Sequence, residues 1–150
     1  MPDLKDKAIG VIVYYKSKRT LKFLILKHKK GHWSFAKGHS EKGESPLQTA
    51  KRELKEEAGI KNVKFVSEKV LLNEKYTFKK KSGRKVYKSV DYFIAGVNSD
   101  EVKIDFDEIM DYRWRSLNQS EKLLTYKLSQ KTLEKAKIII INFLKKLNKI

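Results

Sequence analysis

Residues 38–60, GHSEKGESPLQTAKRELKEEAGI, constrain this chain more than any other stretch. Within this segment, Glu53, Glu56 and Glu57 stand at positions i, i+3 and i+4. On a helix, side chains with this spacing project from one side and converge. Carboxylates held together repel one another unless a cation lies between them. Because every side-chain ligand would be an oxygen, we expect a hard divalent ion, Mg²⁺ or Mn²⁺, beside a helix in this segment.

The same segment carries signals for both ends of that helix. Ser45 is a favourable N-cap, Pro46 suits the first helical position, and Gln48 completes a capping-box pattern. Gly59 suits the left-handed conformation that closes a helix. An apolar stripe runs between these ends and consists of Leu47, Ala50, Leu54 and Ala58. We therefore expect one helix with a packing face toward a sheet and a separate ligand face.

The fixed positions of the segment match the Nudix box, G-x5-E-x7-R-E-U-x-E-E-x-G-U, in which U is an apolar residue. All nine specified positions are filled. The chain therefore resembles a Nudix hydrolase. The resemblance implies an α/β fold, an α/β/α sandwich with a mixed β-sheet between helices. It also implies metal-assisted attack of water on phosphorus in a nucleoside diphosphate that is linked to another group.

The resemblance assigns metal binding to the box carboxylates. Glu56 and Glu57 are the expected ligands, and Glu53 is expected beside them. The backbone carbonyl near Lys37 or Gly38 is expected to join this set. The implied cofactor is Mg²⁺, for which Mn²⁺ could substitute.

The resemblance also implies catalytic roles. Arg52 is expected to orient a glutamate through a charge-assisted hydrogen bond. Glu44 is expected to brace the loop before the helix. Glu57 belongs to the catalytic set, but the general base stays open, because Glu53 and Glu108 are both candidates.

Two further segments narrow the resemblance. WSFAKGHSEKGES resembles the W-x-x-P-K-G-H-x-E-x-G-E pattern of asymmetrical diadenosine tetraphosphate (Ap4A) hydrolases, with Ala36 where that pattern has proline. DEIMDYRWRSL resembles the E-x-x-x-Y-R-W segment of the same group. The implied reaction converts Ap4A and water to ATP and AMP, so the implied partner is a dinucleoside polyphosphate or another nucleotide.

Such a substrate needs aromatic rings for adenine and cations for its phosphates. By resemblance, Tyr76 and Tyr126 are the stacking candidates. Cationic and imidazole side chains are the candidates for phosphate binding: Lys37, His39, His32, Lys79 and Lys81.

Two other functions remain open. One is an RNA 5′-pyrophosphohydrolase that acts on triphosphorylated ends, which the formal charge of +17 would suit. The other is a nucleotide-binding Nudix module without catalysis, which the complete set of box carboxylates disfavours. Most lysines are scattered singly, as on a solvated surface.

Length and composition complete the expectations. Residues 1–150 are expected to form a single domain in the cytoplasm, because the chain has no cysteines, signal-peptide pattern or apolar run that could cross a membrane. The resemblance to the Ap4A hydrolase group further implies a monomer. Alternating apolar residues predict strands at 8–15, 21–28, 63–72, 74–78, 86–97 and 112–115 and a short extended segment at 33–35. Helices are expected at 118–126 and 130–148, the second with apolar residues on one buried side.

Overall fold

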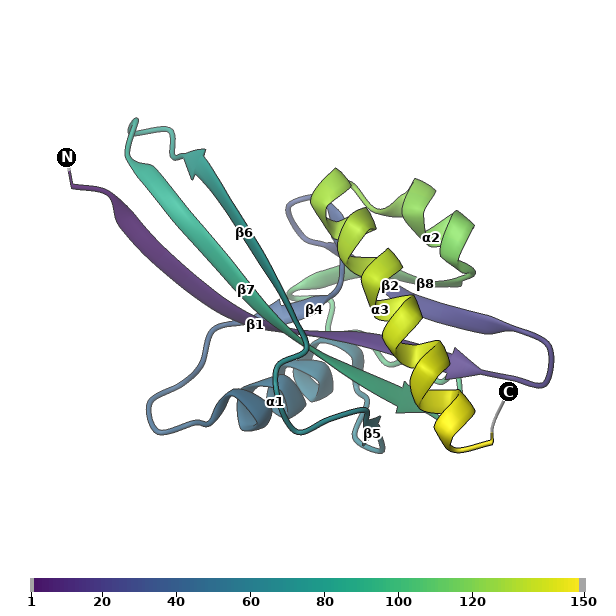
Figure 1. Ribbon diagram of the computed structural model, residues 1–150. Helices are drawn as coiled ribbons and strands as arrows, with labels where there is room; N and C mark the ends of the chain where they lie inside the picture. The colour runs from purple at the N-terminus through teal and green to yellow at the C-terminus, as the bar shows by residue number, and fades with distance from the viewer. Residues whose placement is uncertain (1, 149–150) are drawn as a thin grey trace.

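A computed structural model describes residues 2–148 of the chain, which fold around a mixed sheet of eight strands (Figure 1). The sheet has the order β3-β2-β1-β7-β5, with β4 paired to β1, β6 to β7 and β8 to β2. The strands are β1 (Leu4–Lys16), β2 (Leu21–His28), β3 (Trp33–Ser34), β4 (Ala36–Gly38), β5 (Lys64–Phe65), β6 (Leu72–Lys79), β7 (Lys85–Val97) and β8 (Ile109–Arg115).

The parallel pair β1 and β7 forms the centre of the sheet. Its register runs without interruption from the Leu4–Val86 pair to the Tyr15–Val97 pair. The segment AIGVIVY of β1 is buried throughout because both faces of this part of the sheet are covered. The pair therefore forms the buried centre of the sheet, on which the elements of the box segment pack.

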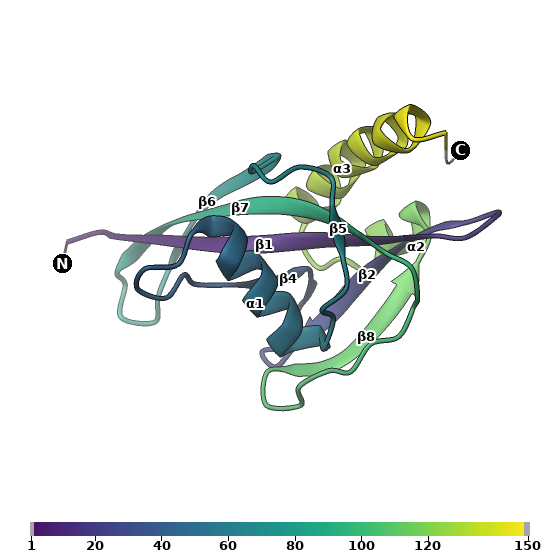
Figure 2. The ribbon, with the colours of Figure 1, turned by 90° about the horizontal axis from the view of Figure 1, so that it is seen from below.

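Helices cover the two faces of the sheet (Figures 1 and 2). Helix α1 (Pro46–Ala58) packs Ala50, Leu54 and Ala58 against one face. Helices α2 (Leu117–Leu123) and α3 (Lys127–Lys146) cover the other, where α3 contributes Leu133, Ala136, Ile140 and Leu144 to the core. This arrangement confirms the predicted α/β/α sandwich.

The strands β1, β6 and β7 extend together beyond the helices as an arm (Figure 1). Strand β1 begins at Leu4, four residues before the predicted start at 8, although LKDK is not an apolar segment. Its polar half is held in strand conformation by the ladder with β7 rather than by burial on both faces.

The predicted strand at 63–72 is wrong for most of its length. Only Lys64–Phe65 pairs as β5, and the ladder of β6 begins at Leu72. Between them, single hydrogen bonds from the Val66 and Leu71 amides to the β7 carbonyls of Ile94 and Tyr92 hold an irregular segment. Apolar residues in this segment therefore reflect packing on the core, not strand alternation.

The predicted helix at 118–126 ends at Leu123, and α3 begins at Lys127 rather than at 130. Leu124 and Tyr126 have extended backbones, with φ/ψ of −58°/129° and −109°/138°, which separates the two helices. Among residues 2–148, no helix is long and apolar enough to span a membrane.

Candidate active site

The local sequence of the box segment determines both ends of α1. The Ser45 side chain accepts from the Gln48 amide at 3.2 Å, and the Gln48 side chain accepts from the Ser45 amide at 2.8 Å. Gly59 ends the helix at a φ of 66°, and a Cβ at this position would lie 2.7 Å from the Lys103 carbonyl oxygen. These contacts confirm the predicted caps and fix the rotation of α1, and therefore the direction of its carboxylates.

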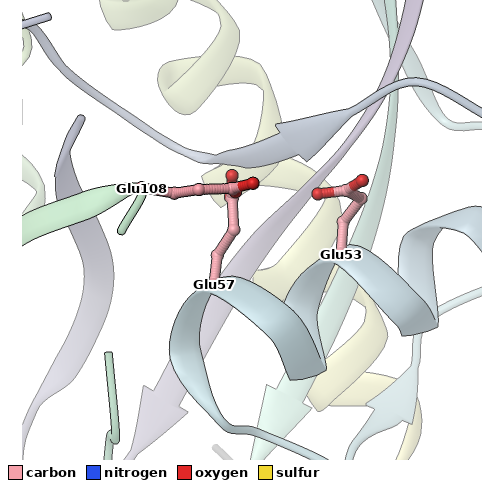
Figure 3. A group of neighbouring side chains, drawn as sticks. All are labelled: Glu53, Glu57 and Glu108. Atoms are coloured by element: carbon pink, nitrogen blue, oxygen red, sulfur yellow. The ribbon is translucent and has the colours of Figure 1, made fainter. Parts of the chain in front are cut away.

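Three carboxylates, two from α1 and one from the loop before β8, converge beside the helix. Glu53 and Glu57 come from successive turns of the helix, and Glu108 comes from the residue before β8 (Figure 3). One oxygen from each lies within 4.8 Å of the others. The Glu108 backbone is held by a bond from the Lys29 amide to its carbonyl at 2.9 Å, which ties it to the end of β2. The fold thus joins the box helix to a residue more than fifty positions away.

Burial and mutual repulsion make the ionised form of this cluster costly. Burial raises the pKa of Glu57 to about 9, and the neighbouring Glu53 and Glu108 contribute to the increase. Burial also raises the pKa of Glu53, although Arg52 opposes that increase. A backbone hydrogen bond from Lys37, at 3.0 Å to Glu57 Oε1, opposes the increase in the pKa of Glu57. The cluster therefore has the electrostatics of a site that a cation would complete.

Arg52 links the box carboxylates to the preceding loop. Its Nε and Nη2 donate to the two carboxylate oxygens of Glu44 at 2.7 and 3.0 Å. Its Nη1 donates to Glu53 at 2.9 Å and to Glu56 at 3.1 Å, and Nη2 also donates to the His39 carbonyl at 2.8 Å. The hydrogen bonds from Arg52 lower the pKa of Glu44 to about 2. Glu44 also accepts from the Glu41 amide at 2.7 Å, which is the bracing expected of it.

Gly38 allows the loop to pass directly against the helix. A Cβ at this position would overlap the Glu53 carboxylate, so no larger residue fits without moving that side chain. Strand β4 places Gly38 opposite Ile9 of β1, and Lys37 opposite Gly10. The backbone near the carboxylates is therefore positioned by the central sheet.

The carboxylates open onto a cavity of about 490 Å³. Its charged and polar lining includes Lys37, His39, Arg52, Glu53, Glu56, Lys88 and Glu108. Lys37 is mostly buried, and this burial, together with the nearby charge of Lys88, lowers its pKa. Glu56 is more exposed and stands outside the group of three converging carboxylates, where it pairs with Arg52. The structure thus brings Glu108 into the cluster and leaves Glu56 at the rim.

Asp6 and Lys88 were not identified as candidate site residues from the sequence. Asp6 accepts from His39 Nε2 at 2.6 Å and from Lys88 Nζ at 2.7 Å, and it holds both side chains at the cavity. A signal was present, because Lys88 stands between Val86 and Val90 on the apolar side of the β7 alternation. A lysine at such a position needs a partner or a cavity.

The aromatic candidates lie on the face of the sheet that α3 covers. Tyr76 pairs in register with Lys88, and it is 36% exposed. Tyr126 precedes α3 and is 55% exposed, with its ring centroid 5.9 Å from that of His32. Burial raises the pKa of Tyr76, and Glu74 and Tyr126 add to the increase. His32 also stacks on His28 at 4.7 Å.

The hairpin lysines lie elsewhere. Lys79 ends β6, Lys81 lies in the turn that follows, and both are exposed and absent from the cavity lining. The hairpin points away from α1 (Figure 1), so the structure does not bring these two candidates to the carboxylates.

The NUDIX domain family model matches residues 4–136 of the chain. Asymmetrical bis(5′-nucleosyl)-tetraphosphatase of Rattus norvegicus is 31% identical over 138 residues, covering 85% of this chain and 90% of that protein. The enzyme of the same name from Caenorhabditis elegans is 30% identical over 143 residues, covering 91% and 98%. An RNA pyrophosphohydrolase of Nitratiruptor is 36% identical over 92 residues, covering 55% and 57%.

Solved structures agree with these relationships. The chain superimposes on the C. elegans Ap4A hydrolase binary complex with a TM-score of 0.76, at 30% identity, covering 91% of this chain and 98% of that one. The NUDIX domain of Shewanella oneidensis NrtR, complexed with ADP ribose, has a TM-score of 0.71 at 15% identity, covering 93% and 90%. The second similarity shows the fold alone.

Proposed function

The chain belongs to the Nudix hydrolase family, and we propose that it hydrolyses dinucleoside polyphosphates, converting Ap4A and water to ATP and AMP. The observation that carries this proposal is the convergence of Glu53, Glu57 and Glu108 at a cavity that Lys37 and Lys88 also line. Carboxylates to hold a cation and lysines to hold phosphates are the two requirements of phosphoanhydride hydrolysis.

The donor set fits a hard divalent cation. Three carboxylates meet with a raised Glu57 pKa, and every side-chain donor is an oxygen, as Mg²⁺ and Mn²⁺ prefer. We assign Glu53, Glu57 and Glu108 as the residues that would hold Mg²⁺, with Glu56 and the Gly38 carbonyl as further candidates. When bound, the cation would offset the negative charge of the reacting phosphates.

Positive side chains would orient the polyphosphate. Lys37 and Lys88 lie on the same side of the cavity, and their mutual repulsion favours an anion between them. His39 is held beside them by Asp6 and can donate to a phosphate oxygen if its ring rotates. Arg52 stays committed to Glu44, Glu53 and Glu56, so its role is to position carboxylates.

Of the two candidates for the general base, we assign Glu108. The Arg52 guanidinium donates to one carboxylate oxygen of Glu53 at 2.9 Å, so that oxygen is already engaged and less free to accept a proton from water. Glu108 is exposed at the cavity and accepts no bond from Arg52. The cluster needs only one Glu108 oxygen for the cation, so the other oxygen would be free to accept the proton of a water molecule that attacks phosphorus.

The adenine of the substrate would stack between aromatic rings. Tyr76 and Tyr126 are both exposed, and both lie on the α3 side of the sheet. Tyr76 shares its register position with Lys88, which places a stacking ring next to a phosphate-binding charge.

A comparison of two substrates tests the proposal. The wild-type protein should convert Ap4A to ATP and AMP with Mg²⁺, and reaction in ¹⁸O-labelled water should place the label on one product only. Triphosphorylated RNA should be turned over more slowly. Preferred cleavage of the RNA would instead support the pyrophosphohydrolase function, which the Nitratiruptor relative favours. No turnover of either substrate would indicate a binding module.

We further propose that residues 1–150 act as one domain, as a monomer, in the cytoplasm. The cytoplasmic location is supported by the absence of cysteine and by the proposed substrates, which are nucleotides of the cell interior. The monomer rests on the resemblance to the Ap4A hydrolase group. Light scattering coupled to size-exclusion chromatography would test the monomer: a mass near 17.6 kDa is expected, and twice that mass would contradict it.

A further inference from the structure

The arm formed by β1, β6 and β7 has one face that the proposed hydrolysis does not use. Alternate residues of its strands point to the same face as Ile9, which α1 covers further along the sheet. On the arm itself this face is open to solvent. It presents one tyrosine and five lysines, and we call it the lysine face: Tyr87, Lys5, Lys7, Lys75, Lys79 and Lys85.

Tyr87 lies at the middle of this face. It belongs to the central strand of the arm, with Lys5 of β1 and Thr77 of β6 as its cross-strand neighbours. The Lys85 ammonium lies 5.0 Å from the ring centroid, and the side chain remains 42% exposed. A flat ring is thus presented to solvent with cations around it.

The charge of the face is strongly one-sided. In the next cross-strand row, Lys75 and Lys7 flank Ser89, and at the far end Lys79 stands opposite Lys85. Within the described strands of the arm, Asp91 is the one acid on this face, and it pairs with Lys7 at 3.4 Å. Like charges opposite one another weaken a sheet, so the arrangement favours an anionic partner.

Protection of sheet edges explains only part of the pattern. Lysines on β1 and β6 discourage edge-to-edge pairing with another sheet. Edge protection does not explain Tyr87, because this residue lies on the central strand and exposes an aromatic ring where a polar residue would suffice. A ring among lysines has the composition of a surface that stacks bases and binds the phosphates between them.

We propose that the lysine face binds single-stranded nucleic acid, with one base stacked on Tyr87 and neighbouring phosphates on the lysines. The face adjoins the active site, because Lys7 is two residues from Ile9, the strand partner of Gly38. Binding of single-stranded nucleic acid to this face does not require the carboxylate cluster. It therefore extends the proposed hydrolysis without depending on it.

Fluorescence anisotropy with a labelled single-stranded oligonucleotide tests this surface. The probe carries a 5′-hydroxyl and is used without divalent metal, so that the carboxylate site is not engaged. RNA and DNA probes of the same sequence distinguish the two possible ligands. Tighter binding of the RNA probe identifies RNA as the ligand, and equal binding shows that the face accepts either RNA or DNA. A duplex of the same sequence should bind more weakly, because its bases are not free to stack.

Two variants and a matched control separate stacking from charge. Tyr87→Leu keeps an apolar side chain but should weaken binding by about 5- to 100-fold, the range for loss of one stacked base. The triple variant K5Q/K75Q/K85Q should weaken binding and lower the salt slope by about 2. The control K122Q/K131Q/K135Q removes the same charge from exposed lysines of α2 and α3, and should change binding less than about twofold.

Unchanged binding by Tyr87→Leu, or an equal loss in the control, would overturn the proposal in favour of diffuse surface charge. Thermal unfolding of each variant confirms the fold. The kcat for Ap4A should be unchanged in all three variants, since none of these residues lines the cavity. Absence of Ap4A turnover in the wild type, with oligonucleotide binding intact, would count against the hydrolysis alone.

Discussion

At the scale of single residues, Glu57 links protonation to cation binding. Its pKa of about 9 means that it is protonated at neutral pH when no cation is bound. Cation binding near pH 7.5 should therefore release about one proton, and affinity should rise with pH until about pH 9. Calorimetry in buffers of different ionisation enthalpy measures the proton count. Glu57→Gln should bind the cation weakly, lose most Ap4A turnover and release no proton, whereas Lys55→Gln on the exposed side should behave as wild type.

The same shift makes the stability of the cation-free protein depend on pH. The unfolded chain releases the Glu57 proton near pH 4.5, whereas the folded chain keeps it until about pH 9. The free energy of unfolding should therefore fall as pH rises through this window, and Glu57→Gln should remove that contribution. Urea unfolding at several pH values checks this sign. An identical pH dependence in the variant would contradict the raised pKa.

Gly38 tests the close contact between loop and helix. Gly38→Ala would force the Glu53 carboxylate aside, and a displacement of about 1 Å at a reacting centre can cost about 100-fold in rate. Ap4A turnover should fall by about that factor, and the increase in melting temperature on adding Mg²⁺ should shrink. The melting temperature without Mg²⁺ is the control for folding. Full turnover in this variant would show that Glu53 has no fixed role.

Much of the candidate site was visible at this scale. The spacing of Glu53 and Glu57 predicts two carboxylates on one side of a helix, and both rise from the same side of α1 (Figure 3). Glu56 shares the spacing but pairs with Arg52 instead. Helical spacing predicts which side of the helix a residue lies on, but not which partner its side chain contacts. Asp6 and Lys88 were not predicted, since their pairing depends on a strand register that joins positions 82 residues apart.

At the scale of elements, the capping box of α1 aligns the whole site. Ser45→Ala should lower the free energy of unfolding by about 1 kcal/mol, because the Gln48 amide loses its acceptor. Chemical denaturation of S45A, Q48A and the double variant measures the coupling of the two reciprocal bonds. The double variant should lose less than the sum of the single losses. Ser82→Ala, at the exposed hairpin tip, should leave stability nearly unchanged, and an equal loss there would contradict the role of the cap.

Elements with local signals were the predictable ones. The ends of α1 follow from Ser45, Pro46 and Gly59, which act within one turn of chain. The predicted strand at 63–72 is wrong because the conformation of this segment depends on isolated hydrogen bonds to β7. The polar start of β1 at Leu4 depends likewise on a partner strand that is distant in sequence.

At the scale of the whole molecule, the net charge of +17 should act on substrate capture. Raising NaCl from about 20 to about 200 mM should raise the KM for Ap4A several-fold with little change in kcat, because screening weakens long-range attraction more than contacts inside the cavity. The effect should be smaller for a dinucleoside triphosphate, which carries less charge. A fall in kcat with constant KM would indicate that salt disturbs the carboxylate cluster instead.

The overall architecture was predictable because the box resemblance carried the topology with it. Alternation alone yielded most strands but no sheet order, since pairing such as β1 with β7 joins distant segments. The extension of the arm beyond the helices has no local signal either. The proposed nucleic-acid surface of the arm depends on this arrangement. The contact between Asp6 and Lys88 depends on it as well.

Anomalous diffraction from crystals grown with Mn²⁺ and a non-hydrolysable dinucleotide tests the carboxylate cluster most directly. We predict a strong manganese peak between Glu53, Glu57 and Glu108, at about 2.1–2.2 Å from their oxygens, with a phosphate oxygen completing the coordination. The absence of a peak there while the nucleotide is bound, or a peak held by other side chains, would contradict the account.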